Sequence, residues 1–392
     1  MDHLGRTLEI LEHLVAFDTT SAGSNLDLID YVAQMLSDAH IGFSRVYDEY
    51  RTKAGLIATI GPNVPGGIVL SGHTDVVPVA GQNWLGNPFT LRHDNGRLFG
   101  RGTADMKGFL AAVLACLPLF EQGALKIPIY LAFSYDEEIG CLGAPPLIKH
   151  LVDSVPLPSI VIVGEPTQMK VANRHRGLNA YLTTVQGRDG HSSAPENGVN
   201  AIAVAAQCIK RLTDRAAAGF LTSGSHSADH SDERPTLNIG TISGGTALNI
   251  IAARCQFAWE CRSAAEDASQ VLLEDLDQFH QEVSPDYRVR APDFSIETEN
   301  TIFVPPLRPN PEATAEHLAL MLTGQNRCIS APFATEAGHF SAAGLDTVVC
   351  GPGSVAQAHQ PDEFVTMAQL EACISFLHRL ASWMQKSHSE KI

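Results

Sequence analysis

The sequence predicts an α/β protein whose mixed, mostly parallel sheet lies between helices and whose chain is interrupted by an inserted α+β domain. Apolar runs in the first part of the chain end in polar residues about thirty positions apart, as in parallel strands joined by helices. From residue 174 the strands alternate between apolar and polar residues, and from 298 the first pattern resumes. We therefore expect one discontinuous domain, 1–173 with 298–392, and an inserted domain, 174–297.

The first domain begins with two amphipathic helices. Leucines at helical spacing predict a helix that ends near Phe17, and a second helix is expected over 26–39. Further along the chain we expect strands at 54–60, 67–71, 127–134 and 160–163, and a helix at 106–120. The strands at 127–134 and 160–163 are almost wholly apolar, which is typical of strands covered on both faces.

The inserted domain shows the order strand, helix, two strands, helix, strand, which is typical of a ferredoxin-like α+β domain. Its helices are expected at 200–217 and 264–283, and the alternation around Trp259 predicts a strand with one buried face. The polar stretch 223–234 is interpreted as a loop in preference to a metal site formed by His226 and His230. After the insertion we expect a helix at 313–323, a strand at 347–350 and a closing helix from Thr366.

Composition narrows the class of protein. The chain has 392 residues, of which 44% are hydrophobic and 18% charged, and its net charge of −16 argues against nucleic acid or an anionic membrane as a partner. Its 8 cysteines form no Cys-x-x-Cys pair, so we interpret them as buried thiols in a reducing compartment. Neither a signal peptide nor a membrane span is recognisable, which predicts a cytoplasmic protein.

Five residues near the ends of predicted strands have side chains that bind metal: His73, Asp105, Glu138, Glu165 and His359. Because parallel strands joined by helices bring their carboxyl ends to one edge of a sheet, we expect these side chains to share a site for two divalent cations, with zinc favoured. Asp105 can bridge both cations, His73 and Glu165 complete one site, and Glu138 and His359 complete the other. Any one of these residues alone is weak support, since short motifs are common on protein surfaces.

Two neighbouring carboxylates complete the predicted chemistry. Asp75 lies two residues after His73, where its carboxylate is expected to accept the imidazole's other N–H. Glu137 precedes Glu138, so one side chain can bind metal while the other takes a proton from the attacking water. The set therefore predicts metal-assisted hydrolysis of an amide.

These motifs resemble the M20 family of dizinc peptidases and deacylases, and the resemblance covers essentially the whole chain. The segments that carry it are Ser71–Asp75, Gly100–Gly108, Asp136–Glu138 and Gly164–Pro166. Within that family, residues 351–363 and 235–249 resemble the acetylornithine deacetylases.

The resemblance implies a dizinc-peptidase-like catalytic domain with a ferredoxin-like lid that forms a homodimer. It implies hydrolysis of N2-acetyl-L-ornithine, a small N-acyl amino acid, to acetate and L-ornithine in arginine biosynthesis, with two Zn²⁺ ions or, alternatively, Co²⁺. Three alternatives stay open: a succinyl-diaminopimelate desuccinylase, another aminoacylase or dipeptidase of the family, and a non-catalytic metal-binding relative.

The resemblance also implies roles for residues of the lid. His191 matches a histidine that polarises the scissile carbonyl, often from the partner subunit; its alternative is a surface histidine at a strand end. Asn249 matches a position near the oxyanion. Arg262 matches a position that binds the substrate carboxylate, which suits a guanidinium, or it pairs with Glu260 instead.

Three further positions lie in the C-terminal part of the chain. Gly353, within the segment that resembles the deacetylases, is expected to contribute to substrate binding. Glu336 matches an acidic residue in the active-site cleft. His339 has no role in the family and is interpreted as structural.

Overall fold

The computed structural model describes residues 2–122, 125–219, 235–265 and 268–386, which form two compact units. Unit 1 comprises Met1–His175 and Leu307–Ile392, and unit 2 comprises Arg176–Pro306. The sequence places the second boundary at 297/298, but that position falls within a strand, β12 (Ser295–Val304), that pairs with β9 of unit 2. The loop expected at 223–234, with His226 and His230, lies outside the described residues.

Unit 1 is built on an eight-stranded mixed sheet in the order β1-β2-β6-β3-β7-β14-β8-β13. Its strands are β1 (Gly42–Tyr47), β2 (Ala54–Ile60), β3 (Ile68–His73), β6 (Ile129–Ser134), β7 (Ile160–Pro166), β8 (Ala172–His175), β13 (Ile329–Ala331) and β14 (Asp346–Gly351). The four central strands β6, β3, β7 and β14 are parallel neighbours, so their carboxyl ends lie at one edge. This arrangement confirms the predicted fold class.

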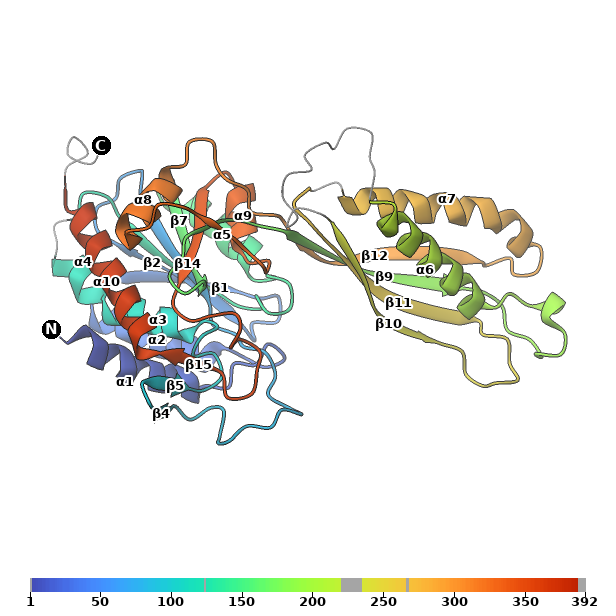
Figure 1. Cartoon of the computed structure of the whole chain (residues 1–392), viewed down its shortest axis with the longest axis horizontal. Coiled ribbons are helices and arrows are strands. Elements are labelled where there is room, and N and C mark those ends of the chain that lie inside the picture. The colour runs from blue at the N-terminus through green and yellow to red at the C-terminus, as the bar shows by residue number, and fades with distance from the viewer. Residues whose placement is uncertain (1, 123–124, 220–234, 266–267, 387–392) are drawn as a thin grey trace. The chain divides into compact units, whose positions relative to one another are not determined.

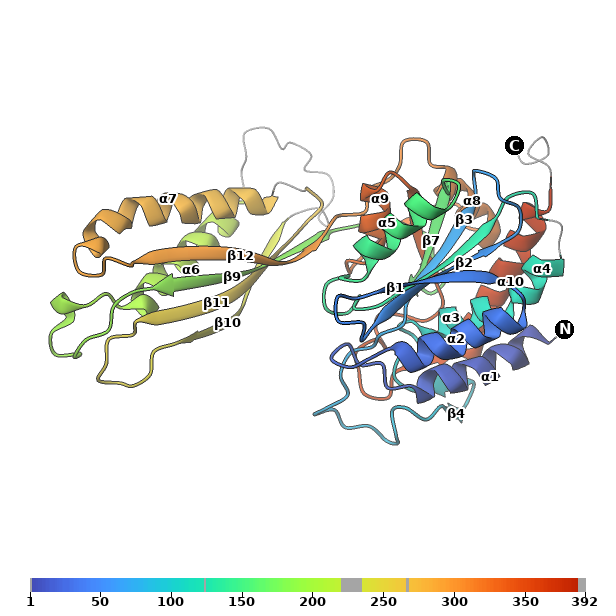
Figure 2. The same ribbon diagram turned by 180° about the vertical axis from the view of Figure 1, so that it is seen from behind.

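Helices cover both faces of this sheet (Figures 1 and 2). The helices of unit 1 are α1 (His3–Ala16), α2 (Leu26–Asp38), α3 (Lys107–Ala115), α4 (Leu117–Gln122), α5 (Ala144–Ser154), α8 (Thr314–Thr323), α9 (Ala337–Ala342) and α10 (Met367–Met384). Every residue of α3 is buried, because this helix contacts β3 and β7 on one side and α1 and α10 on the other. The helix expected at 106–120 ends at Ala115, since Pro118 cannot donate a backbone hydrogen bond within a continuous helix.

A second, three-stranded sheet in unit 1 was not predicted. It has the order β15-β5-β4 and joins β15 (Phe364–Thr366) to β5 (Arg97–Phe99) and β4 (Arg92–Asp94). Its strands are too short for hydrophobic periodicity to reveal them. The pairing brings the chain after His359 back against the segment before Asp105.

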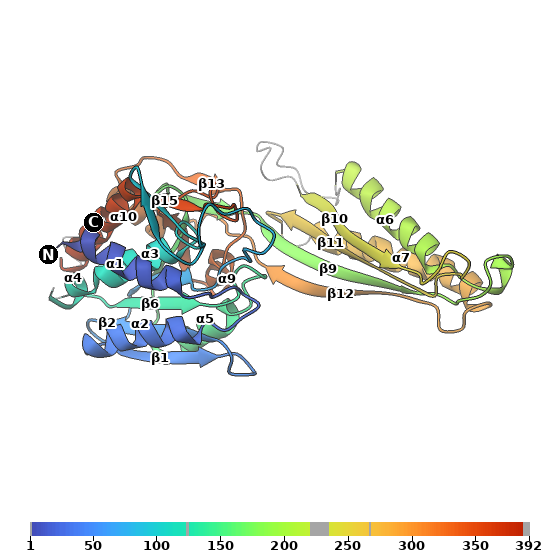
Figure 3. The same ribbon diagram turned by 90° about the horizontal axis from the view of Figure 1, so that it is seen from below.

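Unit 2 contains a four-stranded antiparallel sheet in the order β10-β11-β9-β12, with two helices (Figure 3). Its elements are β9 (Gly177–Gln186), α6 (Ala201–Ala217), β10 (Thr236–Gly244), β11 (Arg254–Ser263), α7 (Ala268–Arg288) and β12 (Ser295–Val304). The predicted order of strands and helices is therefore correct. The inward side chains of β11, including Phe257 and Trp259, are buried against α6 and α7, as the alternation predicts.

All 8 cysteines are free thiols, and seven are buried. Among the described residues, no helix is both long and apolar enough to cross a membrane.

Candidate metal centre

The predicted ligands meet at the carboxyl edge of the central strands in unit 1. His73 ends β3, Glu165 lies near the end of β7, and Glu138 follows β6. Asp105 lies in the turn that leads into α3, and His359 lies in the loop after β14. The parallel order of these strands explains why residues far apart in sequence share one edge.

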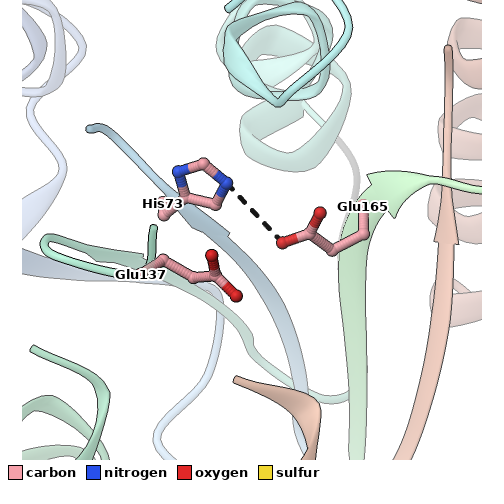
Figure 4. Close-up of side chains that lie close together, drawn as sticks. All are labelled: His73, Glu137 and Glu165. Carbon is pink, nitrogen blue, oxygen red and sulfur yellow. Dashed lines mark ion pairs between the residues drawn. The ribbon is translucent and has the colours of Figure 1, made fainter. Parts of the chain in front are cut away.

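Both carboxylate oxygens of Asp105 face a histidine. Nε2 of His73 lies 3.0 Å from Oδ1 of Asp105, and Nε2 of His359 lies 3.5 Å from Oδ2. His73 also lies 3.6 Å from Oε1 of Glu165 (Figure 4), and His359 lies 2.9 Å from Oε2 of Glu138. Asp105 therefore occupies the central position expected of a bridging ligand, with one acid and one histidine on either side.

Potential ligand atoms converge in two groups within the described part of the chain. One contains His73, Asp105 and Glu138, and the other contains His73, Glu137 and Glu165, with all ligand atoms of a group within 4.8 Å of one another. Figure 4 shows the second group, in which the side chains of Glu137 and Glu165 point toward His73. Glu137 thus lies beside His73 and Glu165.

Asp75 contacts more groups than the sequence predicts. Nδ1 of His73 lies 2.9 Å from the backbone oxygen of Asp75 but 3.5 Å from its carboxylate, so the imidazole donates to the carbonyl. The carboxylate instead accepts the backbone N–H groups of Glu137 at 3.1 Å and Glu138 at 3.3 Å, and the hydroxyl of Ser21 at 2.7 Å. Asp75 therefore orients His73 with its main chain and the two glutamates with its side chain.

His73 lies between acceptors on both sides of its ring. A carbonyl oxygen cannot donate, so Nδ1 of His73 must carry the proton in the bond to Asp75. Burial acts to lower the pKa of this ring, but its contacts with Asp105 and Asp75 raise the pKa well above its usual value. Nε2 faces the carboxylates of Asp105 and Glu165, so this position needs a positive charge, which either a proton on Nε2 or a bound divalent cation supplies.

The acids of the site outnumber the histidines that face them. Burial raises the pKa of Glu137 to about 8, and the charges of Glu138 and Asp105 act in the same direction against the opposing effect of His73. Burial and the charge of Asp105 raise the pKa of Glu165 well above its usual range. Oε1 of Glu165 is buried and has no hydrogen-bond donor. The nitrogen and oxygen donors present fit zinc, so the residues and the implied metal agree.

Glu336 lies beneath the site, which corrects its expected place in the cleft. The side chain is 0% exposed and accepts hydrogen bonds from the hydroxyls of Ser71 at 2.7 Å and Ser134 at 2.6 Å. These serines lie on β3 and β6, just before the ligand-bearing strand ends. Burial raises the pKa of this carboxyl, and the two hydroxyl bonds act against that shift. Glu336 thus joins two neighbouring strands directly under His73.

Cys141 contacts the predicted base. Its thiol lies 3.3 Å from Oε1 of Glu137, to which it donates, and its backbone N–H donates to the Glu137 carbonyl at 2.9 Å. Burial raises the pKa of this thiol well above its usual value, so it stays protonated. Cys141 is thus a buried thiol that orients Glu137.

Gly353 is placed by a backbone requirement. Its φ is +89°, and a Cβ atom built on it would lie 3.0 Å from the Cβ of Ala104. Both the left-handed conformation and the close approach favour glycine. The predicted substrate-binding position therefore lies against the turn that carries Asp105.

In unit 2 the structure brings two of the three predicted residues close together. The backbone N–H of Ser192 donates to the carbonyl of Asn249 at 3.1 Å, and His191 pairs with Ile250 in an isolated bridge. The backbone N–H of Ser193 donates to Nδ1 of His191 at 3.2 Å, so the proton of the neutral ring is on Nε2. His191 is exposed and presents an N–H donor, as carbonyl polarisation requires.

Arg262 lies at the other end of the same sheet. It is eight residues along β11 from Arg254, which corresponds to roughly 26 Å of strand from the end that carries His191. Its Nε donates to Glu260 at 3.0 Å and its Nη2 at 3.3 Å, so the pairing considered as an alternative is present. His191 and Arg262 of one chain are therefore too far apart to contact the same small molecule.

Three residues with an evident influence on the site were missed: Gln82, Arg101 and Glu363. Arg101 and Glu363 lie inside segments that carry the family resemblance, but no role was assigned to either. A buried ion pair such as that of Arg101 with Glu363 cannot be recognised from sequence. The one available signal was an arginine between two glycines in a predicted turn, where a charged side chain often has a functional contact.

Comparisons with known proteins agree with this geometry. The sequence profile of peptidase family M20/M25/M40 matches residues 69–383. An acetylornithine deacetylase from Proteus mirabilis is 34% identical over 385 residues, which cover 94% of this chain and 92% of the relative. One from Pasteurella multocida is 32% identical over 391 residues, which cover 95% of this chain and 96% of the relative.

Two solved structures share the fold. The M20 family metallo-carboxypeptidase Sso-CP2 from Sulfolobus solfataricus has a TM-score of 0.76 and 18% identity, over 98% of this chain and 100% of that one. A dinuclear metal-binding peptidase of the M20 family from Bacillus subtilis has a TM-score of 0.67 and 16% identity, over 97% of each chain. At these identities the likeness supports the fold alone.

Proposed function

This chain belongs to peptidase family M20/M25/M40, and from that premise we propose that it hydrolyses N2-acetyl-L-ornithine to acetate and L-ornithine using two zinc ions. The observation that carries the proposal is the position of Glu137, a carboxylate that lies beside ligands able to hold two cations. The substrate is supported by the acetylornithine deacetylases, which resemble this chain over nine-tenths of its length.

The proposed proton transfers use Glu137. Two divalent cations, when bound, lower the pKa of water to roughly 7 and polarise an acyl carbonyl. Glu137 accepts a proton as the water oxygen attacks the acyl carbon. The amide C–N bond then breaks, and Glu137 returns this proton to the departing amine nitrogen. Asp75 and Cys141 hold Glu137 in place, through its backbone N–H and its carboxylate respectively.

Unit 2 supplies the proposed contacts to the rest of the substrate. The Nε2–H of His191 polarises the acyl oxygen, Asn249 lies beside the same oxygen, and Arg262 binds the substrate carboxylate. Because His191 and Arg262 lie at opposite ends of one sheet, we propose that they serve the two different sites of a homodimer. The dimer and a cytoplasmic location remain predictions.

The test is steady-state hydrolysis by zinc-loaded and cobalt-loaded protein, with and without a chelator. N2-acetyl-L-ornithine is compared with N-succinyl-L,L-diaminopimelate, a neutral N-acetyl amino acid and a dipeptide. A chelator-sensitive preference for acetylornithine is the expected result. Preference for another substrate would retain the amide hydrolase and reject acetylornithine, whereas inactivity at full metal occupancy would favour the non-catalytic relative.

A further inference from the structure

Glu363 binds the turn that carries Asp105 through several hydrogen bonds. Its Oε1 accepts the backbone N–H groups of Ala104 at 2.8 Å and Asp105 at 3.1 Å. Its Oε2 accepts the backbone N–H of Gly102 at 3.0 Å and Nη1 of Arg101 at 2.7 Å. One carboxylate thus satisfies four donors from five consecutive residues, and one of these residues is the central ligand.

The turn is held by hydrogen bonds and not by a helix or a strand, and these include Arg101 N–H to the Pro88 carbonyl at 2.8 Å and Thr103 N–H to the Gly100 carbonyl at 3.1 Å. Residues 101–106 lie between β5 and α3 and belong to neither a helix nor a strand. They are buried, so their backbone N–H groups have no access to water and need acceptors within the protein. Glu363 supplies the acceptors for Gly102, Ala104 and Asp105, and its own backbone carbonyl accepts the N–H of Gly100 at 2.9 Å.

Arg101 extends the contact to the second histidine. Arg101 and Glu363 are each 1% exposed, so the ion pair is shielded from water and its two charges compensate one another. Nη2 of Arg101 donates to Oε1 of Gln82 at 2.6 Å, and Nε2 of Gln82 donates to the backbone carbonyl of His359 at 2.8 Å. A continuous chain of hydrogen bonds therefore joins Asp105 to His359.

We propose that Glu363 is a positioning residue, which with Arg101 and Gln82 fixes Asp105 and His359 at the separation needed to hold two cations. The inference rests on the proposed metal-dependent function but does not depend on the substrate. A carboxylate is required at this position, because the amide of glutamine would turn a donor toward either Arg101 and Gly102 or Ala104 and Asp105. Aspartate keeps the charge but is one methylene too short to reach all four donors.

The experiment compares parent, E363Q and E363D proteins in three measurements: Zn²⁺ affinity by competition calorimetry, visible absorption of the Co²⁺-loaded protein, and thermal unfolding. D346N is the matched control. Asp346 also accepts a buried backbone N–H, from Ala315 at 2.8 Å, but lies at the opposite end of its strand from the site.

We expect E363Q to weaken Zn²⁺ binding about 10- to 100-fold, as outer contacts of metal ligands typically do. The Zn²⁺ affinity of E363D should lie between those of E363Q and the parent, and the Co²⁺ absorption bands of both variants should shift. D346N should match the parent in Zn²⁺ affinity and in Co²⁺ absorption. Zn²⁺ affinity within twofold of the parent in folded E363Q and E363D would overturn the proposal.

If E363Q does not fold, Q82A carries the same test, because Gln82 touches the His359 backbone and its loss leaves the ion pair intact. Q82A is expected to weaken Zn²⁺ binding several-fold, and unchanged affinity together with unchanged Co²⁺ absorption would reject the inference. Since Zn²⁺ binding is measured without substrate, failure of acetylornithine hydrolysis in the parent would reject the proposed function separately.

Discussion

The predicted site residues of unit 1 and those of unit 2 are held in different ways. In unit 1, His73 is 0% exposed and its neighbours Asp105 and Glu165 are buried, although the fifth predicted ligand, His359, is exposed. In unit 2, His191 and Asn249 lie on exposed loops that contact each other through the main chain. Buried groups that depend on one another couple cation binding to stability, whereas exposed groups can contribute to turnover alone.

The largest effect expected in unit 1 is that of E137Q. Replacing the base with an amide of the same shape should lower kcat by about 10²–10⁴-fold, because glutamine cannot accept the proton. Zinc content, measured by elemental analysis, should remain at the parent level. Near-parent turnover at full zinc occupancy would remove Glu137 from the mechanism. A parallel loss of zinc would instead make Glu137 a ligand alongside His73 and Glu165.

The corresponding change in unit 2 is H191A. Loss of one donor to the developing oxyanion should lower kcat by about 10²–10³-fold. Zinc affinity and the unfolding temperature should be unchanged, because the side chain of His191 is exposed and contacts the backbone N–H and the hydroxyl of Ser193, which lies on the same loop. H93A, at an exposed histidine of β4, is the control. Weaker zinc binding in H191A would contradict the division between the two units.

Replacement of Glu336 tests stability beneath the site. E336A leaves the hydroxyl of Ser134 without its acceptor and the hydroxyl of Ser71 with only the Ala132 carbonyl at 3.1 Å, and it should lower the free energy of unfolding by about 1–3 kcal/mol. E336Q should lower the free energy of unfolding by less, since its amide oxygen still accepts one hydroxyl. Urea unfolding of each variant, with metal removed by a chelator, measures both changes. Equal stability of parent and E336A would show that the two strands do not need this link.

The smallest effect concerns pH and lies away from the ligands. Burial lowers the pKa of His339 to about 4, and its Nε2 has no hydrogen-bond partner. The unfolded chain therefore binds more protons than the folded one between pH 6.5 and about 4, so stability falls as the pH drops through this window. Between pH 7 and pH 4.5 the free energy of unfolding should fall by about 1–3 kcal/mol less in H339L than in the parent, because leucine does not titrate. An identical pH dependence in both proteins would exclude His339 as a contributor.

The sequence was sufficient for the features that follow from periodicity. Apolar runs and their polar ends located β6 and β7 and placed the predicted ligands at one edge of the sheet. Alternation around Trp259 identified the sheet of unit 2. Helix α5, which starts at Ala144 with two prolines in its first turn, was not predicted, although proline is common at that position.

Contacts between distant segments could not be inferred from periodicity. The carboxylate of Asp75 lies 3.5 Å from its expected partner, His73, but it also accepts backbone N–H groups 62 and 63 residues away, which the sequence did not indicate. Glu363 contacts residues about 260 positions earlier, through a sheet of three-residue strands that gives no periodic signal. Such partners are fixed by tertiary packing, which local patterns do not encode.

The position of β14 in the large sheet has a consequence for synthesis of the chain. This strand lies between β7 and β8, yet all of unit 2 is translated before it. At ribosomal rates of about 5–20 residues per second, the 180 residues from Pro166 to Asp346 take about 9–36 s. Throughout that interval β7 has an unpaired apolar edge, which is a template for aggregation. Nascent chains are therefore expected to depend on chaperones until residue 351 has emerged, while unit 2, being continuous in sequence, can fold first.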